Sequence, residues 1–134
     1  LILVERGGVF VIREWNSGSA AAIDNPSDGA WRLTGSSGIV TIPNLFEQNK
    51  RGIHAVKEIL RRENVYNVPI YNIVVFSGDR IRFRYRSEKL TTAEALLDTL
   101  RDFNRNKFLS QSEISDAVTA IRKYMRKSGS RTTK

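Results

Sequence analysis

A run of apolar residues near the N-terminus ends abruptly in side chains that could do chemistry. Residues 8–12 read Gly-Val-Phe-Val-Ile, and Arg13, Glu14, Trp15 and Asn16 follow directly. A guanidinium binds phosphate, a carboxylate can hold a cation, and an indole offers a stacking surface. Because side chains alternate along a strand, Arg13 and Trp15 share one face and Glu14 lies on the other. The run therefore predicts a buried strand whose polar end suits an anionic ligand.

Arginine recurs at every second position of a later segment, where it alternates with Ile81, Phe83 and Tyr85. The four residues are Arg80, Arg82, Arg84 and Arg86. The alternation predicts a half-buried strand over 80–86 with a basic outer face. Four like charges repel one another unless an anion compensates, which favours a stripe that follows the phosphates of a nucleic acid. The alternative is a solvated edge strand, whose charge blocks aggregation.

Other apolar patterns indicate the strands that would position these side chains. Residues 1–4 and 9–15 predict a hairpin that turns at two glycines. Residues 31–34 and 39–42 predict a second, smaller hairpin. The run Ile73-Val74-Val75-Phe76 predicts a strand that is covered on both faces.

Three helices are predicted from one pattern that recurs at their starts. Each start places a capping side chain three residues before a glutamate, in the pairs Asn44…Glu47, Thr91…Glu94 and Ser110…Glu113. Such a pair satisfies N–H groups of the first turn and puts negative charge near the positive end of the helix dipole. Apolar residues at helical spacing follow each pair, namely Leu45, Ile53, Val56 and Leu60, then Leu96, Leu97, Leu100 and Phe103, then Ile114, Ala117, Val118, Ile121 and Met125.

The order of these elements predicts a single α/β domain over residues 1–125, with a central mixed sheet flanked by helices. Residues 126–134 are polar and basic and predict a flexible tail.

The composition excludes several classes of protein. Net charge is +8, which favours polyanionic partners such as nucleic acid. The absence of cysteine excludes a disulfide framework and a thiolate metal site, and it fits the cytoplasm. No apolar run approaches about 18 residues, so no membrane partner is expected. His54 is the only histidine, and neither a serine-hydrolase triad nor a phosphate-binding loop of the Gly-Lys-Ser/Thr type is indicated.

Four segments, in order, resemble the nuclease-related domain (NERD) family. The first is the strand 8–16, followed by Gly18, and the second is Trp31 in a Trp-x-x-Thr context. The third, residues 44–49, is similar to the Asn-Pro-x-x-Gln-Asn start of the family's main helix, with Leu45 in place of the proline. The fourth is Ile73-Val74-Val75-Phe76-Ser77-Gly78. Together they cover about residues 1–80.

The resemblance implies a restriction-endonuclease-like (PD-(D/E)XK) fold with a Mg²⁺-dependent nuclease site. In the family, a Glu-x-Lys signature follows the apolar run, and an Asp on the preceding strand completes the metal site. Here Arg13 and Trp15 occupy the Glu and Lys positions, and the Asp would fall just before Leu1. A guanidinium roughly 4 Å from a divalent ion costs on the order of 8 kcal/mol at an effective dielectric of about 20. The signature is thus degenerate, and we expect no metal site.

Two residues could still support catalysis. A bulge at the strand end could turn Glu14 inward, with Lys50 or Lys57 replacing the missing lysine. Otherwise Glu14 is a carboxylate at a strand end that pairs with a neighbouring arginine. By the resemblance, Gln48 lies near the active site and could bind metal-bound water or a phosphate oxygen, whereas its structural role would be to bind backbone at the helix start.

Three hypotheses of function remain. The leading one is a catalytically degenerate domain that binds nucleic acid, with Arg13 on phosphate, Trp15 on an unpaired base, and the arginines of 80–86 as further contacts. The second is an active Mg²⁺- or Mn²⁺-dependent DNA endonuclease that uses Glu14, Gln48 and residues outside the chain. The third is a protein-interaction module, with a protein partner or a homo-oligomer.

Overall fold

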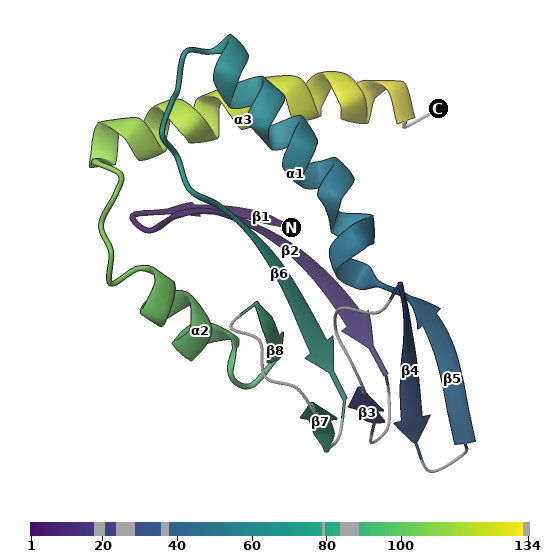
Figure 1. The fold of residues 1–134 in the computed structure, drawn as a ribbon. Coiled ribbons are helices and arrows are strands. Elements are labelled where there is room, and N and C mark those ends of the chain that lie inside the picture. Colours follow the sequence, from purple (N-terminus) through teal and green to yellow (C-terminus); the bar gives the residue numbers. More distant parts are fainter. Residues whose placement is uncertain (18–20, 24–28, 36–37, 79, 84–88, 133–134) are drawn as a thin grey trace.

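The fold is built from two β-sheets and three helices (Figure 1). The computed structural model describes residues 1–17, 21–23, 29–35, 38–78, 80–83 and 89–132. The strands are β1 (Ile2–Glu5), β2 (Gly8–Asn16), β3 (Ala21–Ile23), β4 (Ala30–Gly35), β5 (Gly38–Pro43), β6 (Ile70–Ser77), β7 (Ile81–Phe83) and β8 (Leu90–Thr92). The helices are α1 (Leu45–Arg62), α2 (Leu96–Phe103) and α3 (Gln111–Thr132).

The first sheet is mixed and has the strand order β1-β2-β6-β8. β1 and β2 form the predicted antiparallel hairpin, whereas β2 and β6, and β6 and β8, are parallel. The second sheet has the order β5-β4-β3-β7, and its β4–β5 hairpin was also predicted. β2 leads to β3 and β6 leads to β7, so the chain passes twice from the first sheet to the second.

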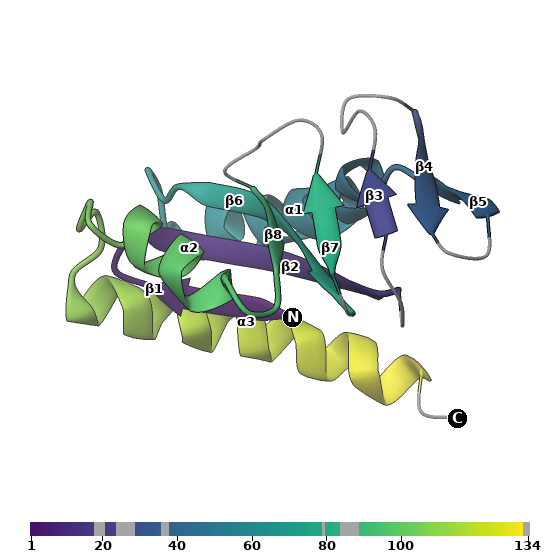
Figure 2. The same ribbon diagram turned by 90° about the horizontal axis from the view of Figure 1, so that it is seen from below.

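Helices cover both faces of the first sheet (Figures 1 and 2). Val9 and Val11 pack against α1 and α3, in a cluster with Val56, Leu60, Ala117 and Ile121. Phe10 and Ile12 pack on the opposite face against α2, in a cluster with Ile73, Val75 and Leu100. The predicted alternation of β2 is therefore confirmed, and so is the α/β class with a central mixed sheet flanked by helices, an arrangement consistent with a restriction-endonuclease-like fold.

The strand predicted at 73–76 is covered on both faces. Ile73 and Val75 face α2, whereas Val74 and Phe76 belong to a third cluster with Trp31 and Leu45. This third cluster joins the second sheet to the first, because it combines residues of β4, α1 and β6.

Two of the three predicted helix caps are present. Asn44 accepts hydrogen bonds from the N–H groups of Phe46 and Glu47, at 2.9 and 3.3 Å. Ser110 and Glu113 form the full reciprocal pair: the Ser110 N–H donates to the Glu113 carboxylate at 3.0 Å, and the Glu113 N–H donates to the Ser110 hydroxyl at 3.2 Å. The backbone N–H of Ser110, and after it the Ser110 hydroxyl, hold the pKa of the Glu113 carboxyl below its usual range.

The cap predicted at Thr91 is wrong. Thr91 lies buried in β8, and its hydroxyl bonds that of Thr99 at 3.0 Å. The turn before α2 is instead held by Thr92, whose hydroxyl accepts from the Ala95 N–H at 3.2 Å. Leu97 was predicted to be apolar core, but it is 73% exposed because the short α2 buries only one narrow face.

The C-terminal helix is longer than predicted. α3 continues past Met125 to Thr132, through part of the segment predicted to be a flexible tail. The loss of the apolar pattern after Met125 therefore does not mark the end of the helix, which backbone hydrogen bonds continue. Among the described residues, no helix combines the length and apolar composition needed to cross a bilayer.

Candidate nucleic-acid interface

The polar end of β2 lies beside β6 in an unbroken parallel register. Arg13 is aligned with Val74, Glu14 with Val75 and Trp15 with Phe76. Because every residue from Val9 to Asn16 has one partner on β6, β2 contains no bulge, so the bulge that could have turned Glu14 inward is absent.

A cavity of about 420 Å³ opens at this end of β2. Its lining comes from β1, β2, α1 and α3, and consists of Leu1, Ile2, Val11, Ile12, Arg13, Glu14, Asn49, Gly52 and Met125. Arg13 and Glu14 both contribute although they lie on opposite faces, so the cavity extends around the edge of the strand. Both side chains are exposed. Arg13 and Glu14, two of the residues singled out from the sequence, therefore lie at the same cavity.

Glu14 has a hydrogen-bond partner on the neighbouring strand. The Ser77 hydroxyl donates to the Glu14 carboxylate at 3.0 Å. Beyond this bond, the Ser17 N–H donates to the Ser77 carbonyl at 2.9 Å. These bonds tie the ends of β2 and β6 together, so Glu14 has a structural role at the strand end, although its partner is a serine and not the arginine that was expected.

Gln48 does not line this cavity, whereas its neighbour Asn49 does. Gln48 is exposed on the first turns of α1, and Asn49 is 5% exposed. The Asn49 amide nitrogen donates to the Val11 carbonyl at 2.7 Å and to the Asn72 side-chain oxygen at 2.8 Å. The amide nitrogen of Asn72 in turn donates to the Phe46 carbonyl at 2.9 Å.

This network fixes α1 against β2 and β6 beside the cavity, and the sequence prediction missed it. A signal was present, because Leu45, Asn49, Val56 and Leu60 are buried at helical spacing along α1. Asn49 therefore occupies a core position of the helix. A buried amide must be hydrogen-bonded, and the edge of the central strands supplied the partners.

Trp15 is turned toward the core more than toward solvent. It is half-buried and packs against the cluster that contains Trp31 and Phe76. The indole thus helps to hold the second sheet in place, and it offers less open surface for stacking than was expected.

The nuclease-related domain profile matches residues 1–77. The chain belongs to this family. No curated protein and no solved structure matches the chain. The match to the nuclease-related domain ends with β6, so β7, β8, α2 and α3 lie beyond it. It supports a nuclease-related role and includes the whole lining of the cavity except Met125.

The described residues of this nuclease-related domain do not fit a Mg²⁺ ion. Mg²⁺ requires several oxygen ligands, usually including carboxylates. The cavity offers one carboxylate, Glu14, and the guanidinium of Arg13 lines the same space. Among the described residues, no three His, Cys, Asp or Glu side chains lie close enough to share a metal. Asp24, Asp28 and Asp79 lie outside the described residues.

The arginine stripe predicted over 80–86 is described only in part. Ile81 and Phe83 are half-buried against the core and Arg82 is exposed, as the alternation predicted. Arg80 precedes β7 and has a φ of 53°, so it belongs to the turn rather than to the strand. Arg84 and Arg86 lie outside the described residues. β7 is an edge strand of the second sheet, and Arg82 does not line the cavity.

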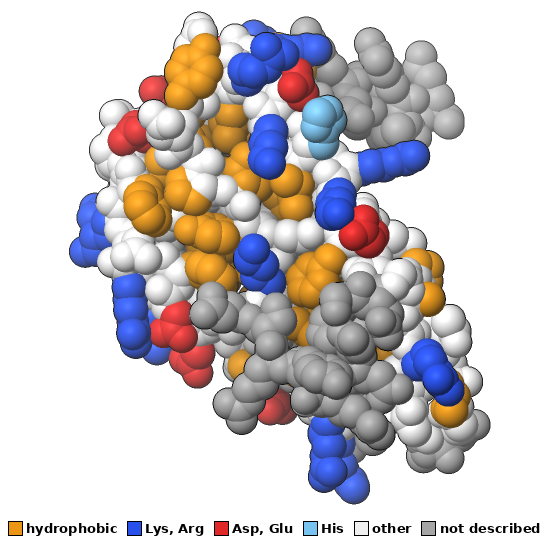
Figure 3. All heavy atoms as spheres, in the orientation of Figure 1, with side chains coloured by type: hydrophobic (Ala, Val, Ile, Leu, Met, Phe, Trp, Pro, Cys, Tyr) orange, Lys and Arg blue, Asp and Glu red, His pale blue; other side chains and the backbone are white. Residues whose placement is uncertain are grey.

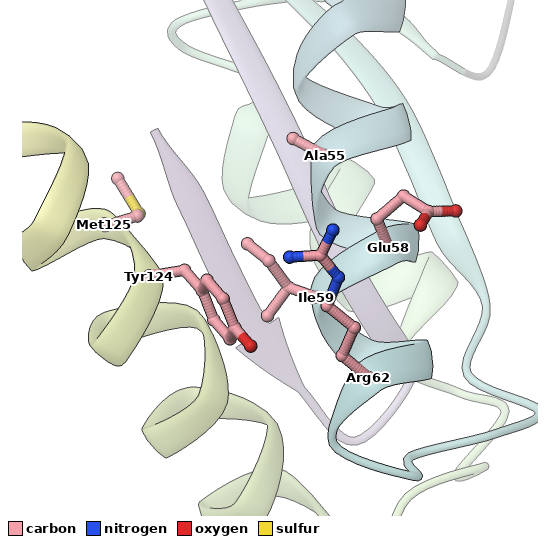
Figure 4. A pocket seen from close by; sticks show the side chains of 6 residues that line it. All are labelled: Ala55, Glu58, Ile59, Arg62, Tyr124 and Met125. Atoms are coloured by element: carbon pink, nitrogen blue, oxygen red, sulfur yellow. The ribbon is translucent and has the colours of Figure 1, made fainter.

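A second hollow, of about 340 Å³, lies between α1 and α3 and shares Met125 with the first. Figure 4 shows Tyr124 and Met125 of α3 opposite Ile59 and Arg62 of α1. The Arg62 guanidinium lies 5.9 Å from the centre of the Tyr124 ring. Glu58 points away from this ring and accepts a hydrogen bond from Arg61 at 2.8 Å, which holds the pKa of the Glu58 carboxyl below its usual range.

On the face seen in Figure 3, the charge of the described side chains is spread rather than gathered. Basic side chains are distributed over this face with acidic side chains among them. Several are paired locally, as Lys50 is with Glu47 and Arg105 is with Asp102. Arg13 differs, since among the residues that the structure describes no acidic side chain pairs with it.

Proposed function

We propose that this nuclease-related domain binds nucleic acid at the end of β2 and does not cut it. The observation that carries the proposal is Arg13, which lies exposed at a cavity at the end of β2. By the sequence resemblance, Arg13 stands where the family has its catalytic glutamate. Its guanidinium has no acidic partner among the described residues, so a phosphate could bind it without displacing one.

Charge supports the same ligand. The chain carries a net charge of +8, which attracts a polyanion over a distance and makes its binding sensitive to salt. Asn49 and Gly52 give the cavity a wall without negative charge, and Glu14 is the only acidic residue among the described residues that line it. Arg82 and the arginines at 84 and 86 are proposed as further phosphate contacts.

The test is the salt dependence of binding to a fluorescent DNA or RNA oligonucleotide. Arg13→Ala is expected to weaken binding by about 1–2 kcal/mol, or roughly 5–30-fold. It should also reduce the slope of log affinity against log salt by about 0.7–0.9, the loss of one phosphate contact. Arg105→Ala, which removes the same charge from a position paired with Asp102, is the matched control. Equal effects of the two substitutions, or no binding by the unaltered protein, would contradict the proposal.

A second candidate function is a Mg²⁺- or Mn²⁺-dependent endonuclease, which the presence of Glu14 at the same cavity favours. A nicking assay on supercoiled DNA with a protein extended upstream of Leu1 separates the two functions. We expect no cleavage with either metal. Cleavage that disappears on Glu14→Gln would establish the enzyme and refute the loss of catalysis, while leaving the salt experiment as the test of binding.

A further inference from the structure

β5 forms an open edge of the second sheet. It is the first strand in the order β5-β4-β3-β7, and within the described part of the chain it pairs with β4 alone. Figures 1 and 2 show it at the outer margin of the molecule, and α1 begins where it ends. An open edge presents a row of backbone groups to which another strand can add.

The register shows which backbone groups of β5 point outward. Gly35 pairs with Gly38, and only two residues connect them. Hydrogen-bonded pairs alternate with pairs that are not hydrogen-bonded along an antiparallel ladder. If Gly35 and Gly38 were not hydrogen-bonded, the next pair, made of the two connecting residues, would have to be. Those two residues are neighbours in the chain, so Gly35 and Gly38 must form the hydrogen-bonded pair. Alternation then directs the N–H and C=O of Val40 and Ile42 toward β4. Those of Ile39 and Thr41 point away from the sheet, and no described backbone group outside the strands bonds them.

The side chains of β5 leave this edge unprotected. Its sequence is Gly-Ile-Val-Thr-Ile-Pro, without a charged residue. Ile39 is 57% exposed and Val40 is 56% exposed. Natural edge strands are usually blocked by lysine, by a bulge or by a covering loop. β7, the opposite edge of the same sheet, carries Arg82, whereas β5 has only Pro43 at its end.

We propose that β5 pairs with β5 of a second copy of the chain, antiparallel and about a two-fold axis at Val40. Ile39 of each copy then lies opposite Thr41 of the other, and these two pairs make about four backbone hydrogen bonds. Val40 lies opposite its own equivalent.

A second copy fits this edge better than a charged ligand. β5 contributes none of the charges that would repel another chain of net charge +8. In the pair, exposed Val40 packs against its own equivalent and exposed Ile39 packs against Thr41. Because the arrangement is two-fold, the outward N–H and C=O groups of Ile39 and Thr41 in each copy bond Thr41 and Ile39 of the other copy. The interface is small, so we expect a weak dimer that forms reversibly. This inference does not depend on nucleic-acid binding.

The first experiment follows mass against protein concentration by analytical ultracentrifugation, without nucleic acid. The mass is expected to rise from 15.2 kDa toward twice that value. Val40→Lys sets two like charges directly opposite each other and should leave a monomer at all concentrations. Thr34→Lys adds the same charge on the neighbouring strand β4 and should still dimerise. A protein that is monomeric at every concentration, or a Val40→Lys variant that dimerises normally, would overturn the proposal.

The second experiment uses the absence of cysteine from the chain. Across the axis, the Val40 positions form a pair that is not hydrogen-bonded, with Cα atoms about 4.5 Å apart, which is within the range of a disulfide. Val40→Cys is therefore expected to form a covalent dimer under mild oxidation. Leu97→Cys, on the exposed side of α2, controls for random collision. Equal yields from the two variants would refute pairing at β5.

Discussion

Replacing Asn49 by alanine tests whether the buried amide network holds α1 on the central strands. The Val11 carbonyl and the Asn72 side-chain oxygen each lose a hydrogen bond, of 2.7 and 2.8 Å. The hydrogen bond to the Val11 carbonyl is buried, so losing it should lower the free energy of unfolding by about 1–2 kcal/mol. The hydrogen bond to Asn72 is partly accessible to water, so losing it should cost about 1 kcal/mol. The expected loss of unfolding free energy is therefore about 2–3 kcal/mol.

Urea unfolding followed by circular dichroism measures this loss. A domain of this size has a total stability of about 5–15 kcal/mol, so the variant should still fold. With a urea dependence of about 1–3 kcal/mol per molar, the midpoint should fall by roughly 0.7–3 M while the slope stays constant. Gln48→Ala, the exposed neighbour on the same helix, is the control and should change the stability by less than about 0.5 kcal/mol.

A double-mutant cycle with Asn72→Ala sharpens the test. If the two amides act as one network, their combined effect should differ from the sum of the single effects by at least about 0.5 kcal/mol. An Asn49→Ala variant as stable as Gln48→Ala, or strict additivity with Asn72→Ala, would refute the role given to the network.

Two further predictions concern backbone space and pH. Gly8→Ala should destabilise by more than about 2 kcal/mol, because Gly8 has a φ of 141° and an added Cβ would lie 2.5 Å from the Pro69 carbonyl oxygen. Gly52→Ala should instead stabilise by about 0.5–1 kcal/mol, since its Cβ would lie 3.4 Å from Val11 within a helix, and thermal melting compares the two. NMR titration should find the Glu113 pKa below its ordinary value of 4.5, and Ser110→Ala should raise it toward that value. Because the pKa is lowered in the folded state, this contribution to stability is present above the ordinary value and is lost as the pH falls through the folded pKa.

Local patterns predicted the parts of the fold that local forces decide. The alternation of β2 and the continuous apolar run of β6 follow from burial on both faces, and the sequence shows both. The pair Ser110 and Glu113 caps α3 because both partners belong to one helical turn. The same spacing at Thr91 failed, because β8 is a three-residue strand that exists only through pairing with β6.

Two residues that line the candidate cavity, Arg13 and Glu14, were singled out from the sequence, but the shape of the cavity was not predicted. Strand parity correctly put Arg13 and Glu14 on opposite faces of β2. The cavity that joins them depends on where β1, α1 and α3 approach the edge of that strand, which no local pattern encodes. The place of Asn49 depends in the same way on Val11 of β2 and Asn72 of β6, two strands that are far apart in the sequence.

The parallel pairing of β2 with β6 also has a consequence for how the chain folds. Val9 pairs with Ile70, so β3, β4, β5 and α1 all lie within the loop that this contact closes. Closing such a loop costs conformational entropy before the contacts between β2 and β6 form and offset that cost. Topologies of this kind therefore fold slowly. On a ribosome, the apolar β2 emerges well before β6 can cover it. The interval between the two is the time in which the chain is most exposed to misassociation.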